Sequence, residues 1–195
     1  FRLPTPLANR MVHLHVQARF DDFKLFAIKQ NLHAFIIGFL SFRPDLLSNE
    51  PVIEDDANPA FATPRSYHML SSILKSADDI TKIAAIIYGT IGYSAGIEFV
   101  SYVKVYEELP DIAAIYEGHY PTIKNEPALL YALVSALVEY FDGSDTHKEH
   151  LFAFSQTLPT EFGVMLIKDV VVKDETLAAY SAFDAWLEKY GEYII

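Results

Sequence analysis

The sequence predicts a mainly α-helical fold, and three observations support this prediction. First, 51% of the 195 residues are hydrophobic and 14% are aromatic, which is enough apolar surface to build a core. Second, apolar residues recur three or four positions apart through most of the chain, as on one face of a helix. Third, prolines and an Asp-Gly pair interrupt these periodic segments, whereas good period-two alternation occurs in one short segment.

The N-terminal segment contains this strand candidate. Pro4 and Pro6 lead into a short apolar turn that Arg10 closes. In residues 11–16, which follow, apolar side chains alternate with histidines. Because one strand cannot form a sheet, we expect the other strands to lie upstream of residue 1, and the chain to be part of a longer protein.

The first helical pattern begins at Phe23. It continues as a nearly apolar helix from Ala34 to Phe42, and Pro44 ends it. Residues 49–62 are rich in proline, asparagine and acidic residues and show no period, so they predict a loop.

Two helix starts follow this loop. Thr63 and Pro64 predict the first, because threonine caps free backbone N–H groups and proline suits the first helical position. Ser76 and Asp79 resemble a capping box and predict the second.

The remaining chain also reads as helices. Ser94 predicts the start of a helix that ends before Pro110, and residues 118–127 form a connector with two prolines. The clearest apolar stripe covers residues 129–141 and ends at an Asp-Gly pair. Three further helices are expected at residues 146–157, 160–171 and 174–190.

Charge and composition exclude several classes of protein. The net charge of −11 and the lack of any Lys/Arg cluster argue against binding to duplex nucleic acid. The absence of cysteine excludes disulfides and thiolate chemistry and fits a reducing cytoplasm, where we expect the protein to reside. The longest stretch without charge, Ile83 to Ile97, is shorter than the roughly 20 residues of a membrane helix, so no membrane partner is expected.

Histidines and acidic residues give no complete metal site. His13 and His15 share a strand face, but no local carboxylate or cysteine completes the set of three or four ligands that a metal needs. His147 and His150 lack the i, i+4 spacing of a zinc helix, which favours a solvated face. The acidic run at 54–56 is typical of a surface loop. We therefore predict no metal ligand in the chain.

Glycine and serine patterns also give no catalytic motif. Gly89, Gly92 and Gly96 have the spacing of points where helices approach closely, and no Gly-Lys-Ser/Thr of a phosphate loop accompanies them. No Gly-x-Ser-x-Gly nucleophile elbow occurs.

Arg65 is the residue that local helix physics does not explain. It lies in the first turn of the helix predicted to start after Thr63, where the helix dipole disfavours a fixed cation by roughly 0.3 to 1 kcal/mol. A surface arginine with a carboxylate partner is one interpretation. A phosphate bound at the helix start is the other, because an anion there is favoured by both the dipole and the guanidinium.

Two short motifs then resemble a known family. Leu-Pro-x-x-Leu-x-Asn-Arg ends at Arg10, and Ala-Thr-Pro-Arg-Ser contains Arg65 and opens a helix. In this order they are similar to the closing part of a MoxR-like AAA+ ATPase, and the similarity extends through most of the chain, including residues 87–111. Met11 and Tyr67 depart from the family, which often has an aromatic residue at the first position and tryptophan at the second.

The resemblance implies a role for each arginine and a division of the chain. Arg10 would be the arginine finger that reaches the nucleotide of a neighbouring subunit, and Arg65 the second sensor that contacts the γ-phosphate of its own subunit. Residues 1–18 would be the end of the α/β ATPase domain, residues 19–120 an AAA+ lid-type helical bundle, and residues 121–195 a C-terminal helical extension.

The resemblance also implies cofactors and partners. ATP and Mg²⁺ are expected, with the phosphate loop and the magnesium ligands upstream of residue 1. The expected assembly is a ring, commonly a hexamer, that remodels a client protein, often with a von Willebrand factor A-type partner. A non-enzymatic all-helical protein-interaction module and a small-molecule-binding helical regulator are the alternatives.

Overall fold

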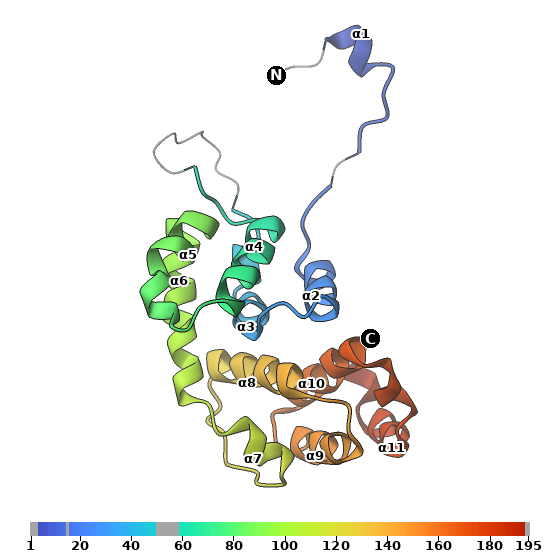
Figure 1. Cartoon of the computed structure of the whole chain (residues 1–195). Coiled ribbons are helices and arrows are strands. Elements are labelled where there is room, and N and C mark those ends of the chain that lie inside the picture. Colours follow the sequence, from blue (N-terminus) through green and yellow to red (C-terminus); the bar gives the residue numbers. More distant parts are fainter. Residues whose placement is uncertain (1–3, 15, 50–58, 194–195) are drawn as a thin grey trace.

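The computed structural model describes residues 4–14, 16–49 and 59–193, which form a helical body with an extended N-terminal arm, residues 4–14 and 16–19 (Figure 1). The α-helices of these described residues are α1 (Thr5–Ala8), α2 (Phe20–Lys29), α3 (Ala34–Phe42), α4 (Pro64–Lys75), α5 (Ala84–Ile91), α6 (Tyr93–Val103), α7 (Ile112–Tyr116), α8 (Pro127–Tyr140), α9 (Asp145–Ser155), α10 (Thr160–Lys173) and α11 (Ser181–Tyr190). Short 3-10 helices are η1 (Pro44–Leu46), η2 (Ile80–Ile83), η3 (Lys104–Glu108), η4 (Glu175–Ala179) and η5 (Gly191–Tyr193). The prediction of a mainly α fold is confirmed.

The strand predicted at residues 11–16 is not formed in its described part. Residues 11–14 and 16 run without regular structure along the arm, and Val12, Leu14 and Val16 are 87%, 82% and 91% exposed. A strand requires a neighbour that pairs its N–H and C=O groups. No other described segment of the chain supplies one.

The first helical pattern is two helices, not one continuous helix. Asn31 adopts a left-handed conformation, with φ of 50°, and so turns the chain between α2 and α3. His33 then caps α3, because its Nδ1 accepts the N–H of Phe35 at 3.3 Å. The helix predicted from Ala34 to Phe42 is confirmed.

The hydrophobic core runs through the whole helical body. In this core α8 packs along α3 and against α10, and α10 packs against α2 (Figure 1). On the other side of α3, the helices α4, α5 and α6 form a second group. The predicted division at residues 120/121 falls in the connector between α7 and α8, across which the core is continuous.

Three predicted helix limits differ from those in the structure. Ser76 ends α4 instead of starting a helix, and regular helix resumes at Ile80. Gly92, with φ of 83°, precedes α6, so that helix begins before the predicted cap Ser94. The helix predicted at 174–190 divides into η4 and α11 at Tyr180, which has an extended backbone.

The end of α8 is held by a cation. Lys173 Nζ donates to the carbonyl oxygens of Val138, Glu139 and Phe141 at 2.7, 2.9 and 2.9 Å. These carbonyls lie at the C-terminal end of α8, where the last turn lacks partners within the helix and a cation is favourable. This contact fastens α10 to α8.

Candidate functional site

A cleft of about 450 Å³ opens where the arm meets the helical body. The arm, α2 and the first turns of α4 line it with Gln17, Ala18, Arg19, Asp22, Phe23, Phe26, Pro64, Arg65 and His68. We call this space the Arg65 cleft. It lies at the predicted boundary between residues 1–18 and 19–120.

The start of α4 is fixed by reciprocal hydrogen bonds. The N–H of Ser66 donates to Thr63 Oγ1 at 3.1 Å, and the N–H of Thr63 donates to Ser66 Oγ at 2.8 Å. This is a capping box in which serine replaces the usual Glu or Gln, so the first turn of α4 carries no acidic side chain. The prediction that Thr63 caps a helix with Pro64 in its first turn is confirmed.

Arg65 is exposed at this helix start and lines the cleft. Its guanidinium has no hydrogen bond or ion pair with the described residues, and its backbone N–H has no acceptor among them. The interpretation of Arg65 as a surface arginine with a carboxylate partner therefore finds no support in the described part of the chain. The helix start offers a guanidinium and a free backbone donor to the same space.

The cleft contains a second arginine and an aromatic pair. Arg19 lies 3.8 Å from an oxygen of Asp21 and 4.0 Å from an oxygen of Asp22, with all three side chains well exposed. Such exposed pairs contribute little to stability. Phe26 and His68 meet edge to face with ring centroids 5.8 Å apart. The cleft thus combines two arginines and one carboxylate, that of Asp22, with an apolar wall.

Arg10 lies on the arm, directly after α1, and does not line the Arg65 cleft. Its N–H donates to the carbonyl of Leu7 at 3.1 Å, and His13 Nε2 lies 2.8 Å from the carbonyl oxygen of Ala8. The arm carries α1 away from the helical body (Figure 1). The structure therefore does not bring the two predicted arginines together within one chain.

The other histidine and acidic candidates form no shared site. His13 follows α1 and contacts the carbonyl oxygen of its last residue, Ala8, whereas His15 and the acidic run at 54–56 lie outside the described residues. No group of three or more His, Cys, Asp or Glu suited to a metal ion occurs among the residues that the structure describes.

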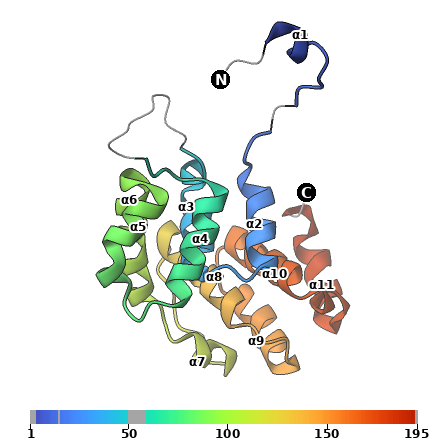
Figure 2. The same cartoon turned by 45° about the horizontal axis from the view of Figure 1, so that its top comes forward.

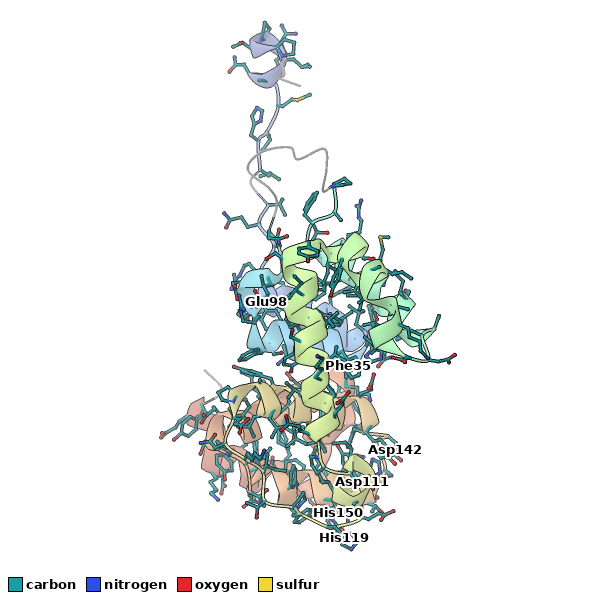
Figure 3. The ribbon with its side chains drawn as sticks, turned by 90° about the vertical axis from the view of Figure 1, so that its left-hand side faces the viewer. Phe35, Glu98, Asp111, His119, Asp142 and His150 are labelled. Atoms are coloured by element: carbon teal, nitrogen blue, oxygen red, sulfur yellow. The ribbon has the colours of Figure 1, made fainter. Side chains whose placement is uncertain are left out.

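His147 is not on the solvated face that its spacing favours, whereas His150 is half-buried and makes its hydrogen bond at the surface. The ring of His147 stacks on Tyr116 with centroids 4.1 Å apart, and its Nδ1 lies 3.0 Å from Asp142. His150 Nδ1 lies 2.8 Å from the hydroxyl of Tyr120. Figure 3 shows His150 and Asp142 at the α7/α9 end of the body, far from the arm. These contacts join α9 to α7 and the connector after it.

The prediction that these glycines mark close approach of helices is confirmed at Gly96 and wrong at Gly89. A Cβ on Gly96 would clash with Tyr88 of the neighbouring helix, so α5 and α6 approach closely there. Gly89 faces open space.

Sequence reasoning missed a buried ion pair on the other side of α2. Lys24 Nζ lies 2.7 Å from Asp169 Oδ2, and the two side chains are 15% and 10% exposed. The burial of Asp169 raises the pKa of its carboxyl. The available signal was the position of Asp169 one helical turn from Leu166 and Val172, on the apolar face of a helix whose inner side is buried.

Comparisons with protein-family models, curated proteins and solved structures found no match to this chain. Within its described residues, no helix combines the length and the apolar character that crossing a bilayer requires.

Proposed function

We propose that this chain is the lid region and helical extension of a MoxR-like AAA+ ATPase, which couples ATP hydrolysis to the remodelling of a client protein. One observation carries the proposal: Arg65 stands at a capped helix start, opens onto a cleft of about 450 Å³ and has no partner among the described residues. A fixed cation at this end of a helix is unfavourable until an anion joins it.

Arg65 would bind the terminal phosphate of ATP. Its planar guanidinium can donate two parallel hydrogen bonds to phosphate oxygens. The backbone N–H of Arg65 has no acceptor among the described residues. Free N–H groups and the helix dipole both favour an anion at this end of α4. When hydrolysis removes the γ-phosphate, this contact is lost and the lid is free to rotate.

Arg10 would act on a neighbouring subunit. Its place on the arm, outside the helical body that carries Arg65, is compatible with a finger that serves another subunit's nucleotide. In a ring, commonly a hexamer, each subunit would then give one arginine and receive another. Mg²⁺ would neutralise phosphate charge at ligands that belong to the α/β domain and are not among these 195 residues.

The proposal is tested by ATP hydrolysis in the full-length protein. Arg65→Ala should weaken the response to the triphosphate and abolish the lid movement, and Arg65→Lys should recover only part of it because lysine cannot form the bidentate contact. Lys104→Ala is the matched control, since Lys104 is an exposed cation of η3 outside the cleft. Unchanged nucleotide affinity and turnover in Arg65→Ala would remove Arg65 from this role. A full-length protein that neither binds nor hydrolyses ATP would favour the interaction module.

A further inference from the structure

A groove of about 440 Å³ lies between α2 and α10, on the side of α2 away from the Arg65 cleft, and we name it the α2/α10 groove. Figure 2 shows α2 beside α10, with the C-terminal part of the chain next to them. Its apolar walls come from Leu25, Ile28, Val164, Met165, Val172 and Tyr193. A groove of this volume is within the range of about 300–1,000 Å³ that binding sites occupy.

The floor of the groove contains the buried pair of Lys24 and Asp169. Both residues line the groove, and their side chains are 15% and 10% exposed. An ammonium group has three N–H donors and a carboxylate has two acceptor oxygens. Among the described residues, Lys24 Nζ has one acceptor, Asp169 Oδ2, and Asp169 Oδ1 has no donor.

Partly buried charges with incomplete pairing keep hydrogen-bonding capacity that water or a ligand can meet. The groove therefore presents donors and an acceptor side by side, within apolar walls, and both remain available to a ligand. A neutral group that accepts one hydrogen bond and donates another from the same side complements this floor, and the carboxamide of asparagine or glutamine is such a group.

We propose that the α2/α10 groove binds an apolar peptide segment of a partner protein, with the side-chain carboxamide of an asparagine or glutamine of that segment on the Lys24–Asp169 pair. The carbonyl oxygen of the carboxamide accepts from Lys24 Nζ, and its N–H donates to Asp169 Oδ1. Side chains flanking this residue pack on Leu25, Met165 and Val172.

Charge around the groove selects against acidic segments. Three carboxylates, those of Asp21, Glu161 and Asp169, line the groove with two lysines, Lys24 and Lys168, so acidic side chains exceed basic ones by one, and the whole chain carries a net charge of −11. A carboxylate on the segment would meet this acidic surround and the oxygen of Asp169, which disfavours it. A neutral or basic apolar segment is the complementary partner.

This inference does not depend on the function proposed for Arg65. The two cavities share no lining residue, because α2 separates them. Loss of binding at one should leave the other intact.

Titration of the protein with a blocked dipeptide tests the proposal. Acetyl-Leu-Leu-amide should bind with a dissociation constant on the order of 0.1–1 mM, as expected for a ligand of this size. Amide signals of α2 and α10 should shift in NMR spectra. The free acid acetyl-Leu-Leu should bind at least about tenfold more weakly, because its carboxylate has no N–H to donate to Asp169 Oδ1 and has the same charge as Asp169. Absence of saturable binding of the amide, or equal binding of the acid, would overturn the proposal.

Two variants connect the binding to the groove. Leu25→Asp should abolish binding, whereas Ile86→Asp should not, since Leu25 and Ile86 are similarly exposed, at 48% and 50%, and Ile86 lies outside the groove on α5. The double variant Lys24→Met, Asp169→Leu removes both charges together and so avoids leaving one unpaired. It should keep the fold and lose the preference for the amide over the acid. Dipeptide binding that survives Leu25→Asp would contradict the assignment. Dimerisation of the protein that Leu25→Asp abolishes would also contradict it, because the occupant of the groove would then be a second copy of the chain.

Discussion

The hydroxyl of Tyr67 donates a hydrogen bond of 2.9 Å to the backbone carbonyl of Leu46, and both residues are buried. Tyr67 lies in α4, two positions after Arg65, and Leu46 ends η1 after α3. This bond fixes the start of α4 against the preceding helix.

Tyr67→Phe is predicted to destabilise the protein. The ring still fills its place, but the carbonyl of Leu46 loses its side-chain donor in a buried setting, which costs about 1–3 kcal/mol. The free energy of unfolding in urea measures this change. Tyr93→Phe is the control, because Tyr93 is 63% exposed and its hydroxyl makes no hydrogen bond with the described residues. Equal stabilities of the two variants would show that the bond to Leu46 contributes nothing.

Thr63→Ala is predicted to lower stability by about 0.5–2 kcal/mol, because it removes the acceptor for the N–H of Ser66. Thr63→Ser keeps an oxygen at this position and should recover most of the loss. Thermal unfolding of the three proteins compares them directly. If Thr63→Ser is as unstable as Thr63→Ala, the methyl group rather than the cap is responsible.

Helices with strong local signals could be predicted from the sequence. The Thr63-Pro64 start and the stripe of α8 are examples, because capping and periodicity are encoded within a few neighbouring residues. The break at Asn31 was missed because periodicity alone continues across it, although asparagine after Lys29 in the last turn is a local signal of a helix end. The strand at residues 11–16 was predicted from alternation alone, and alternation does not supply a pairing partner.

The candidate sites also differ in how much of each could be predicted from the sequence. The position of Arg65 at a helix start followed from adjacent residues, and the structure adds its cleft and its lack of a described partner. The pair of Lys24 and Asp169 could not be predicted, because it depends on how α2 packs against α10, far apart in the sequence. The roles of Arg10 and Arg65 toward a nucleotide stay predictions.

His33 is predicted to make the fold sensitive to mild acid. Burial lowers the pKa of His33 below 6.5, an effect that Lys75 reinforces and Glu139 opposes. The unfolded chain therefore binds a proton more readily than the folded chain as the pH falls through 6.5, so stability decreases toward acid in this window. Protonation would also place a proton on Nδ1, which accepts the N–H of Phe35.

His33→Asn tests this prediction, because asparagine caps a helix but does not titrate. Urea unfolding between about pH 7 and 5 should show a smaller loss of stability in this variant than in the natural protein. His119→Asn, which removes an exposed histidine, should retain the natural pH dependence. The same slope in all three proteins would exclude His33 as the titrating group.

Arg10 is predicted to act between subunits, and mixing two variants separates this from an action within one chain. In the assembled full-length protein, Arg10→Ala should lower turnover on the order of 10³ to 10⁵-fold while largely sparing nucleotide binding, because a finger acts on transition-state charge. Arg65→Ala should impair the nucleotide site of its own subunit.

In a mixed ring, an Arg10→Ala subunit with an intact Arg65 can receive the finger of a neighbouring Arg65→Ala subunit. At equal amounts, about a quarter of the interfaces should then be active, so the mixture should hydrolyse ATP faster than either variant alone. If both arginines served the nucleotide of their own chain, every subunit in the mixture would lack one of them, and mixing would restore nothing.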